Sequence, residues 1–248
     1  MEQDYYTNDF FTNQMPISKK SASVILPELY SIFPFKSMLD IGCGTGEWLN
    51  IASNQLGITD YLGVDGDYVN PNLLAIPKDK FKAFDLKQTL NVERNFDLVL
   101  SAEVAEHLPI EVSDVFIDSI VRHGKVILFS AAAPGQGGTY HVNEQWQDFW
   151  VKKFSNRGFL PIDFLREKLW YKKGVDWWYK QNMILFVQED FLNQNSILKS
   201  YYNQFKKDHY KKVHPEMIFA QKNIHNSLGR FLEAPIYTCK KLFSFIFS

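Results

Sequence analysis

The sequence predicts an α/β fold in which a mostly parallel sheet is covered by helices on both faces. Three observations support this prediction. Short apolar runs of strand length alternate with longer amphipathic segments up to residue 188. Three glycines follow the first run at alternate positions, and an aspartate ends each of the next two runs. Such alternation is typical of parallel strands joined by right-handed crossover helices.

The elements are predicted in chain order, beginning with a helix at Ser18–Phe33, because residues 1–17 show no clear periodicity. Pro27 would divide this helix and Pro34 would end it. A strand then leads through Asp40 into the glycine turn. The later predictions are a helix at Glu47–Gln55, strands at Tyr61–Val64, Lys80–Phe84 and Phe96–Leu100, a helix at Ile110–Arg122, a strand at Lys125–Phe129, a helix at Gln145–Asn156, and strands at Phe159–Leu165 and Met183–Gln188.

The stretch Met38–Leu49, MLDIGCGTGEWL, carries the strongest functional signal. Glycines leave the turn free of side chains, so its backbone can approach a ligand closely. In an α/β sheet such a turn lies at the carboxyl edge of a strand, where ligands bind. The spacing G-x-G-x-G is one residue tighter than the dinucleotide-binding pattern G-x-G-x-x-G.

Two aspartates are expected at the same edge. Asp65 ends the second predicted strand, and an ionised carboxylate there can accept two hydrogen bonds from a ribose diol. Asp85 follows the third strand in the phrase FKAFDLKQ. Aspartate is also a common turn residue after strands, which is the simpler interpretation of either one alone. Two acids in order after a glycine turn favour a ligand site.

The phrase FDLVLSAEVAEHLP, which follows as residues 96–109, completes four segments in a familiar order. The sequence resembles class I S-adenosylmethionine (SAM)-dependent methyltransferases from Met38 to about Gln188. In particular, it is similar to the small methyltransferases of bacterial polysaccharide and secondary-metabolite pathways. The resemblance implies SAM as cofactor. It also implies a doubly wound, Rossmann-like sheet of seven strands, with an antiparallel seventh strand between the fifth and the sixth.

The same resemblance assigns cofactor-binding residues. They are Asp40, Gly42, Gly44 and Gly46 around the methionine part, Asp65 on the ribose, Asp85 and Leu86 at the adenine, and Ser101, Ala102 and Glu103 in the turn beside the sulfonium. Gly66 departs from the pattern, because the family more often has a bulky apolar residue there against the adenine.

Methyl transfer to a hydroxyl requires alignment of the acceptor, exclusion of water and removal of a proton. Two histidines follow the strands that would face the acceptor: His107 after the fourth and His141 after the fifth. An imidazole suits proton removal near pH 7, so both are candidate catalytic residues. His107 can equally serve only to cap a helix. We predict no metal site, because Glu103, Glu106 and His107 would not share one helix face.

An aromatic cluster lies between the last two predicted strands, at Trp170, Tyr171, Trp177, Trp178 and Tyr179. Such clusters are commonly core, but aromatic faces also stack on sugar rings. The expected partner is a small-molecule or saccharide-precursor acceptor of a capsule or surface polysaccharide pathway. A sugar hydroxyl, a phosphate-like oxygen, a carboxylate and an amine all remain open as the methylated group.

Composition bounds the class of protein. The chain has 248 residues, of which 46% are hydrophobic, and a net charge of −1, so we expect a globular protein without general affinity for nucleic acid. Its two cysteines, Cys43 and Cys239, support neither a disulfide framework nor a zinc cluster. The polar start MEQDYYTNDF is unlike a signal peptide, and no apolar run approaches ~18 residues, so no transmembrane segment is expected. The expected location is the cytoplasm, where SAM is made.

The composition changes after residue 188. Residues 1–188 are expected to form the methyltransferase domain, and residues 189–248 a helical, basic extension with nine Lys/Arg against five Asp/Glu. This extension would pack on the core or join two copies as a homodimer. A peripheral membrane contact is the alternative, because basic and apolar residues are mixed within it.

Two rival functions remain from the sequence. One is a nicotinamide-dependent oxidoreductase or epimerase, for which Tyr202 and Lys206 form a Y-x-x-x-K pair. The other is a methyltransferase fold that acts only as a non-catalytic partner module.

Overall fold

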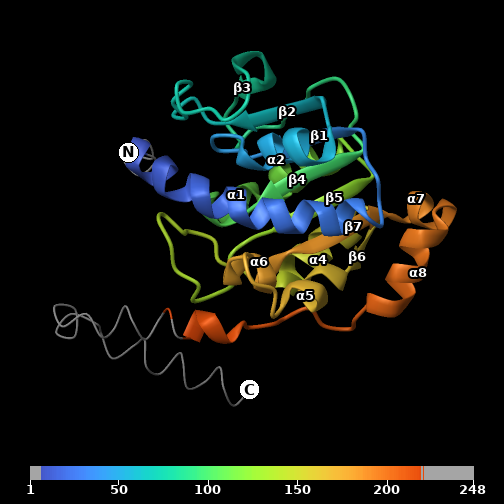
Figure 1. Ribbon diagram of the computed structural model, residues 1–248. Helices are drawn as coiled ribbons and strands as arrows, with labels where there is room; N and C mark the ends of the chain where they lie inside the picture. The colour runs from blue at the N-terminus through green and yellow to red at the C-terminus, as the bar shows by residue number, and fades with distance from the viewer. Residues whose placement is uncertain (1–6, 219, 221–248) are drawn as a thin grey trace, which may run out of the picture. The chain divides into compact units, whose positions relative to one another are not determined.

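A mostly parallel sheet forms the centre of the computed structural model, which describes residues 7–218 and 220. Its seven strands lie in the order β3-β2-β1-β4-β5-β7-β6 (Figure 1). The strand bounds are β1 Ser37–Ile41, β2 Asp60–Asp65, β3 Phe81–Ala83, β4 Leu98–Ala102, β5 Val126–Ser130, β6 Phe159–Ile162 and β7 Ile184–Gln188. Only β7 runs against its neighbours β5 and β6. The predicted fold class and the place of the seventh strand are therefore confirmed.

Helices cover both faces because the strand side chains alternate between two apolar cores. Leu100 and Leu128 face the core that α1, α2, α5 and α6 cover, whereas Val99 and Ile127 face the core under α3 and α4. The helix bounds are α1 Asn8–Tyr30, α2 Glu47–Leu56, α3 Ser113–Val121, α4 Gln147–Ser155, α5 Phe164–Leu169, α6 Trp177–Asn182, α7 Glu189–Gln194 and α8 Ser196–Phe205.

The chain order creates a switch point at the centre of the sheet. From β1 the sheet continues to β2 on one side and to β4 on the other, with Asp40 opposite both Gly63 and Leu100. Successive crossovers diverge there, which leaves a crevice outside the carboxyl ends of the strands. The glycine turn and the segment after β4 therefore meet at one place.

The first helix is longer than predicted. It begins at Asn8 instead of Ser18, where the Thr7 hydroxyl accepts a hydrogen bond from the backbone N–H of Phe10, and it continues through Pro16 and Pro27 to Tyr30. Burial on one face holds the helix together despite these prolines, since packing contributes more than helix propensity. Figure 1 shows α1 running beside α2 along the sheet.

Most of the other predicted elements differ by one or two residues at their ends, and three of the differences change how a segment is described. The strand β4 continues through Ser101 and Ala102, which the sequence had placed in the turn after it. The predicted strand Phe159–Leu165 ends at Ile162, and α5 follows because its apolar side chains have helical spacing. The helix expected from Ile110 starts with the 3-10 turn η4, Ile110–Val112, before α3.

The chain divides into two units, one up to Lys212 and one from Val213 onward. The first unit includes α7 and α8, beyond the change in composition at residue 188. The ring of Tyr201 on α8 packs edge-on against Phe164 of α5, with centroids 5.2 Å apart. Most of the predicted basic extension, including Cys239, lies outside the described residues. No helix within residues 7–218 is both long and apolar enough to cross a membrane.

Candidate active site

A cavity of about 400 Å³ opens at the switch point. Its wall combines the first half of α1, the glycine turn, the ends of β2 and β3, the segment after β4, the loop after β5, and α6. The residues that line it include Phe11, Gly42, Gly44, Asp65, Gly66, Tyr68, Asp85, Leu86, Ala102, Glu103, Glu106, His107, Gln136, Gly138, His141, Trp177, Trp178 and Tyr179. This volume is typical of a site for a small molecule.

Glycine is required in the turn after β1. Gly42 has φ of +85°, and a Cβ there would lie only 2.3 Å from Val104. Its backbone N–H donates to the carbonyl of Val64 at 2.7 Å, which ties the turn to the end of β2. The turn can therefore approach a ligand with backbone alone, as the sequence predicted.

Asp65 joins the two turns that border this side of the cavity. Its carboxylate accepts hydrogen bonds from the backbone N–H of Gly44 at 2.6 Å, the N–H of Gly66 at 2.7 Å and the hydroxyl of Tyr68 at 2.7 Å. Burial raises the pKa of Asp65, although these hydrogen bonds oppose the change. A carboxylate has about four lone-pair sites, so one acceptor site remains for a ligand.

Tyr68 occupies the space that Gly66 leaves open. A Cβ on Gly66 would lie 2.1 Å from the Tyr68 ring, and that ring stacks on Phe11 with centroids 6.4 Å apart. The family more often has a bulky apolar side chain at position 66. Here Tyr68 and Phe11 of α1 fill that space instead. Sequence reasoning missed both aromatic residues. Residues 1–17 showed no helical period that would place Phe11, and the role of Tyr68 depends on its contacts with Gly66 and Phe11.

The other predicted cofactor residues divide into two groups. Asp85 and Leu86 line the cavity, and Asp85 also accepts a hydrogen bond from the N–H of Lys87 at 3.0 Å. Asp40, Gly46 and Ser101 lie behind the wall and do not line the cavity. Burial, followed by the charge of Asp65, raises the pKa of the Asp40 carboxyl well above its usual value.

Glu103 lines the cavity from the segment after β4. Its backbone has φ of +57°, a strained conformation that non-glycine residues adopt mainly where the surroundings impose it. The carboxylate accepts hydrogen bonds from the side-chain amides of Gln136 at 2.7 Å and Asn182 at 3.2 Å. Burial raises the pKa of Glu103, and these hydrogen bonds oppose the change.

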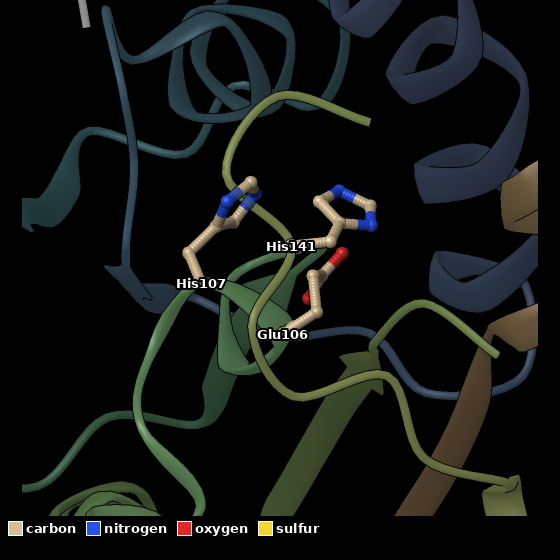
Figure 2. A group of neighbouring side chains, drawn as sticks. All are labelled: Glu106, His107 and His141. Atoms are coloured by element: carbon tan, nitrogen blue, oxygen red, sulfur yellow. The ribbon is translucent and has the colours of Figure 1, made fainter. Parts of the chain in front are cut away.

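The two candidate catalytic histidines come together. The imidazole rings of His107 and His141 meet edge-on with centroids 4.8 Å apart (Figure 2). His107 and Glu106 belong to the 3-10 turn η3, Ala105–His107, whereas His141 belongs to the loop after β5. Burial, and then His141, lower the pKa of His107 to about 4, so this ring is neutral near pH 7.

Glu144 orients His141 and organises its loop. The Nδ1 atom of His141 lies 3.0 Å from the Glu144 carboxylate, which also accepts hydrogen bonds from the N–H groups of Gly135 and Gly137, each at 2.7 Å. Burial opposes ionisation of Glu144, but these contacts outweigh it and lower the pKa of its carboxyl. A carboxylate on Nδ1 directs the Nε2 atom of the ring to other partners.

Glu106 is the least satisfied group in the site. Its side chain is fully buried, and neither carboxylate oxygen has a hydrogen-bond donor among the residues that the structure describes. Burial, and then the charge of Glu103, raise the pKa of the Glu106 carboxyl well above its usual value. The nearest ligand atoms of Glu106, His107 and His141 lie within 4.8 Å of one another, an arrangement that the sequence spacing did not reveal.

The aromatic cluster is divided by the fold. Trp177, Trp178 and Tyr179 on α6 line the cavity. Tyr171 is 91% exposed and does not line it, and Trp170 contacts the Lys212 ammonium at 4.0 Å from its ring centroid.

The Y-x-x-x-K pair also lies outside the cavity wall. Tyr202 belongs to α8, and Lys206 follows that helix with its ammonium 5.9 Å from the Tyr202 ring centroid. The pair therefore gives no support to a nicotinamide-dependent reaction in this cavity.

The sheet order, the glycine turn after β1 and the acids after β2 and β3 define the class I SAM-dependent methyltransferase fold. The family described as "Methyltransferase domain" matches residues 17–181. The chain belongs to this family, whose cofactor is SAM. The rival nicotinamide-dependent class is thereby excluded. No curated protein sequence matches the chain.

Solved structures share the fold at low sequence identity. An O-methyltransferase family protein from Burkholderia thailandensis is 12% identical with a TM-score of 0.55, covering 72% of this chain and 58% of its own. The plantazolicin methyltransferase BpumL, solved with SAH, is 15% identical with a TM-score of 0.52, covering 84% and 90%. Human N-acetylserotonin methyltransferase, solved with SAM, is 15% identical with a TM-score of 0.51, covering 76% and 56%.

The cavity fits the charge of the family's cofactor. SAM carries a positive sulfonium and an ammonium group, and the walls near the glycine turn and β4 present Asp65 and Glu103. Behind the turn, one oxygen of Asp40 is buried and has no hydrogen-bond partner within the described part of the chain. The acidic side chains of Asp65 and Glu103 in the wall are complementary to the positive charges of SAM.

Proposed function

We propose that this protein transfers the methyl group of SAM to an oxygen atom of a small acceptor. The observation that carries the proposal is that one cavity is lined by both sets of predicted residues. The glycine turn, Asp65, Asp85 and Leu86 form the proposed cofactor side, and His107, His141 and the aromatic residues of α6 form the proposed acceptor side. When bound, SAM supplies a methyl group activated by its positively charged sulfur.

Each side has a role in this proposal. The turn Gly42–Gly46 holds the methionine part, Asp65 accepts a hydrogen bond from a ribose hydroxyl, and Asp85 with Leu86 contacts the adenine. Ala102 and Glu103 border the sulfonium, with Asp40, Gly46 and Ser101 supporting the turn from behind. The first half of α1 covers the cavity and limits the entry of water, which would compete with the acceptor.

His141 and His107 are the proposed catalytic residues. Glu144 fixes the orientation of the His141 ring, and the two rings meet at the acceptor side. His141 would accept the proton of the acceptor hydroxyl while its oxygen takes the methyl group and S-adenosylhomocysteine leaves. His107, whose pKa is lowered to about 4, would orient that hydroxyl. Two of the structural relatives bear names of O-methyltransferases, which agrees with an oxygen acceptor.

A saccharide-type acceptor is the proposed substrate class. Trp177, Trp178 and Tyr179 offer aromatic faces on the acceptor side, and such faces suit the C–H-rich faces of sugar rings. The proposed setting is the synthesis of a surface or capsule polysaccharide precursor in the cytoplasm, where SAM is made.

The proposal is tested with SAM labelled in its methyl group. The full chain is incubated with free sugars, sugar phosphates and nucleotide-linked sugars, and with amines as comparison compounds. We expect the label on an ether or ester oxygen, located by NMR of the product. Label found only on nitrogen would overturn the oxygen assignment.

The catalytic residues are tested in the same assay. His141→Ala and His107→Ala should each lower turnover by at least about 100-fold, the lower range for losing an acid–base group, while SAM still binds. His209→Ala is the control, because His209 is exposed and lies outside the cavity. Normal turnover in both site variants would remove the two histidines from the mechanism.

A further inference from the structure

The acceptor side of the cavity contains a group of metal-binding side chains from two separate segments. Glu106 and His107 come from η3, and His141 comes from the loop after β5 (Figure 2). Their nearest ligand atoms all lie within 4.8 Å of one another. Ligands that share one ion with bonds of about 2.1 Å lie roughly 3–4 Å apart. The longest separation in this group is therefore about 1 Å greater than in a coordinated group.

The carboxyl groups of this site favour a bound cation. Glu106 is fully buried, and the carboxyl beside it belongs to Glu103, which is half-buried at the cavity wall. Neither makes an ion pair with Lys or Arg within residues 7–218. Burying a charge without compensation is costly, and in proteins such charges are paired or bind metal ions. Glu106 is fully buried and its oxygens have no donor in the described part of the chain, so a bound cation would satisfy them.

We propose that Glu106, His107 and His141 hold one divalent transition-metal ion on the acceptor side of the cavity. Glu103 lies beside Glu106 as a further carboxylate for the same ion. Two imidazoles with one or two carboxylates suit Mn²⁺, Fe²⁺, Co²⁺ or Zn²⁺ better than Ca²⁺ or Mg²⁺, which prefer oxygen ligands alone.

The surroundings of His141 match those of a metal-binding histidine. Such a histidine usually has a carboxylate on its second ring nitrogen, which orients the ring and increases its basicity. Glu144 holds Nδ1 in this way, and two backbone N–H groups hold Glu144. Gly138 packs closely against the ring edge that carries the other nitrogen, because a Cβ there would lie 2.3 Å from Nε2 of His141. Glu144 is therefore a positioning residue.

The ion would bind the hydroxyl of the acceptor. This role rests on the proposed function, to which it adds the group that binds the acceptor. Three protein ligands leave coordination positions open toward the cavity. An acceptor with two neighbouring hydroxyls, such as a sugar diol, could occupy two of them. In that case the two imidazoles would bind the ion instead of taking the proton. The ion would lower the pKa of the bound hydroxyl, and its proton would pass to water.

The test measures metal binding without SAM or acceptor. The full chain is stripped with EDTA and dialysed, then titrated with Mn²⁺ while EPR reports the free ion. We expect one tightly bound Mn²⁺ per chain. Co²⁺ in place of Mn²⁺ should give visible absorption bands that change in His141→Ala. Absence of stoichiometric binding of both ions would overturn the inference.

Matched variants locate the site. Glu106→Gln, His107→Ala and His141→Ala should each weaken Mn²⁺ binding at least about 10-fold, while SAM binding reports that the fold is intact. Asp65→Ala should lose SAM but keep Mn²⁺, and His209→Ala should keep both. Mn²⁺ affinity unchanged in the three cluster variants would place the ion elsewhere and contradict the proposal.

Glu144→Gln provides a second test if a variant of Glu106, His107 or His141 fails to fold. It leaves all ligands in place and should weaken Mn²⁺ binding by about 10- to 100-fold, as expected for a residue that orients a ligand. Mn²⁺ binding without methyl transfer would reject the proposed function alone. Methyl transfer at an unchanged rate after EDTA treatment, without Mn²⁺ binding, would reject the metal site alone.

Discussion

The carboxylate of Asp65 accepts a 2.6 Å hydrogen bond from the backbone N–H of Gly44, a residue 21 positions earlier in the chain. This bond joins the end of β2 to the glycine turn after β1. The same carboxylate also holds Tyr68, whose ring covers Gly66. One buried side chain therefore determines the shape of the proposed cofactor side.

Asp65→Ala should weaken SAM binding by about 1.5–3 kcal/mol, or roughly 10- to 100-fold, because hydrogen bonds to a charged group are lost. Isothermal titration calorimetry measures the effect, and circular dichroism checks the fold. Asp67→Ala is the control, since Asp67 is exposed and does not line the cavity. Equal SAM affinity in the Asp65 variant and the wild type would reject the ribose assignment.

Asp85→Asn tests the adenine assignment. The carboxylate follows β3, lines the cavity and is exposed, so we expect a loss of SAM affinity smaller than in Asp65→Ala and an unchanged KM for the acceptor. Equilibrium dialysis with labelled SAM and steady-state kinetics measure the two quantities. A raised acceptor KM with unchanged SAM affinity would move Asp85 to the other side of the cavity.

Trp178→Ala tests the acceptor side. Removal of an aromatic face should raise the acceptor KM by about 5- to 10-fold, in line with roughly 1 kcal/mol for an aromatic contact, and leave the Kd for SAM unchanged. Tyr171→Ala is a matched control from the same segment, because Tyr171 is 91% exposed and outside the cavity wall. Similar kinetics in both variants would show that α6 does not contact the acceptor.

The buried ion pair between Asp163 and Arg166 is predicted to stabilise the fold behind α6. The guanidinium donates to both carboxylate oxygens, at 2.5 and 2.7 Å, and to the backbone carbonyl of Gln181 at 3.0 Å. Asp163→Ala leaves the Arg166 charge buried without its partner. We expect a loss of about 3–5 kcal/mol in the free energy of unfolding, measured with urea.

An exposed ion pair provides the comparison for Asp163. Asp114 pairs with Lys153 and Arg157, but its side chain is 63% exposed. Asp114→Ala should therefore cost less than about 1 kcal/mol. A loss for Asp163→Ala no larger than that for Asp114→Ala would show that the buried pair does not stabilise the protein.

The sequence by itself determined the class of fold and the elements that carry the site. Local features of the sequence predicted them: glycines at alternate positions after β1, and acids at the ends of β2 and β3. Turn geometry and strand length relate such features to structure. The family and the sheet order confirm the fold class, and the roles of these glycines and acids in binding SAM stay predictions. The ends of the elements were predicted less accurately, as the start of α1 at Asn8 and the end of β4 at Ala102 show.

Only the tertiary structure decided which side chains meet. His107 and His141 are 34 residues apart and come from loops after different strands, so no local period relates them. Tyr68 covers Gly66 because α1 brings Phe11 against its ring. Glu106 is buried beside Glu103 because η3 follows a strained residue directly after β4. Contacts of this kind depend on packing between distant segments, which sequence spacing does not encode.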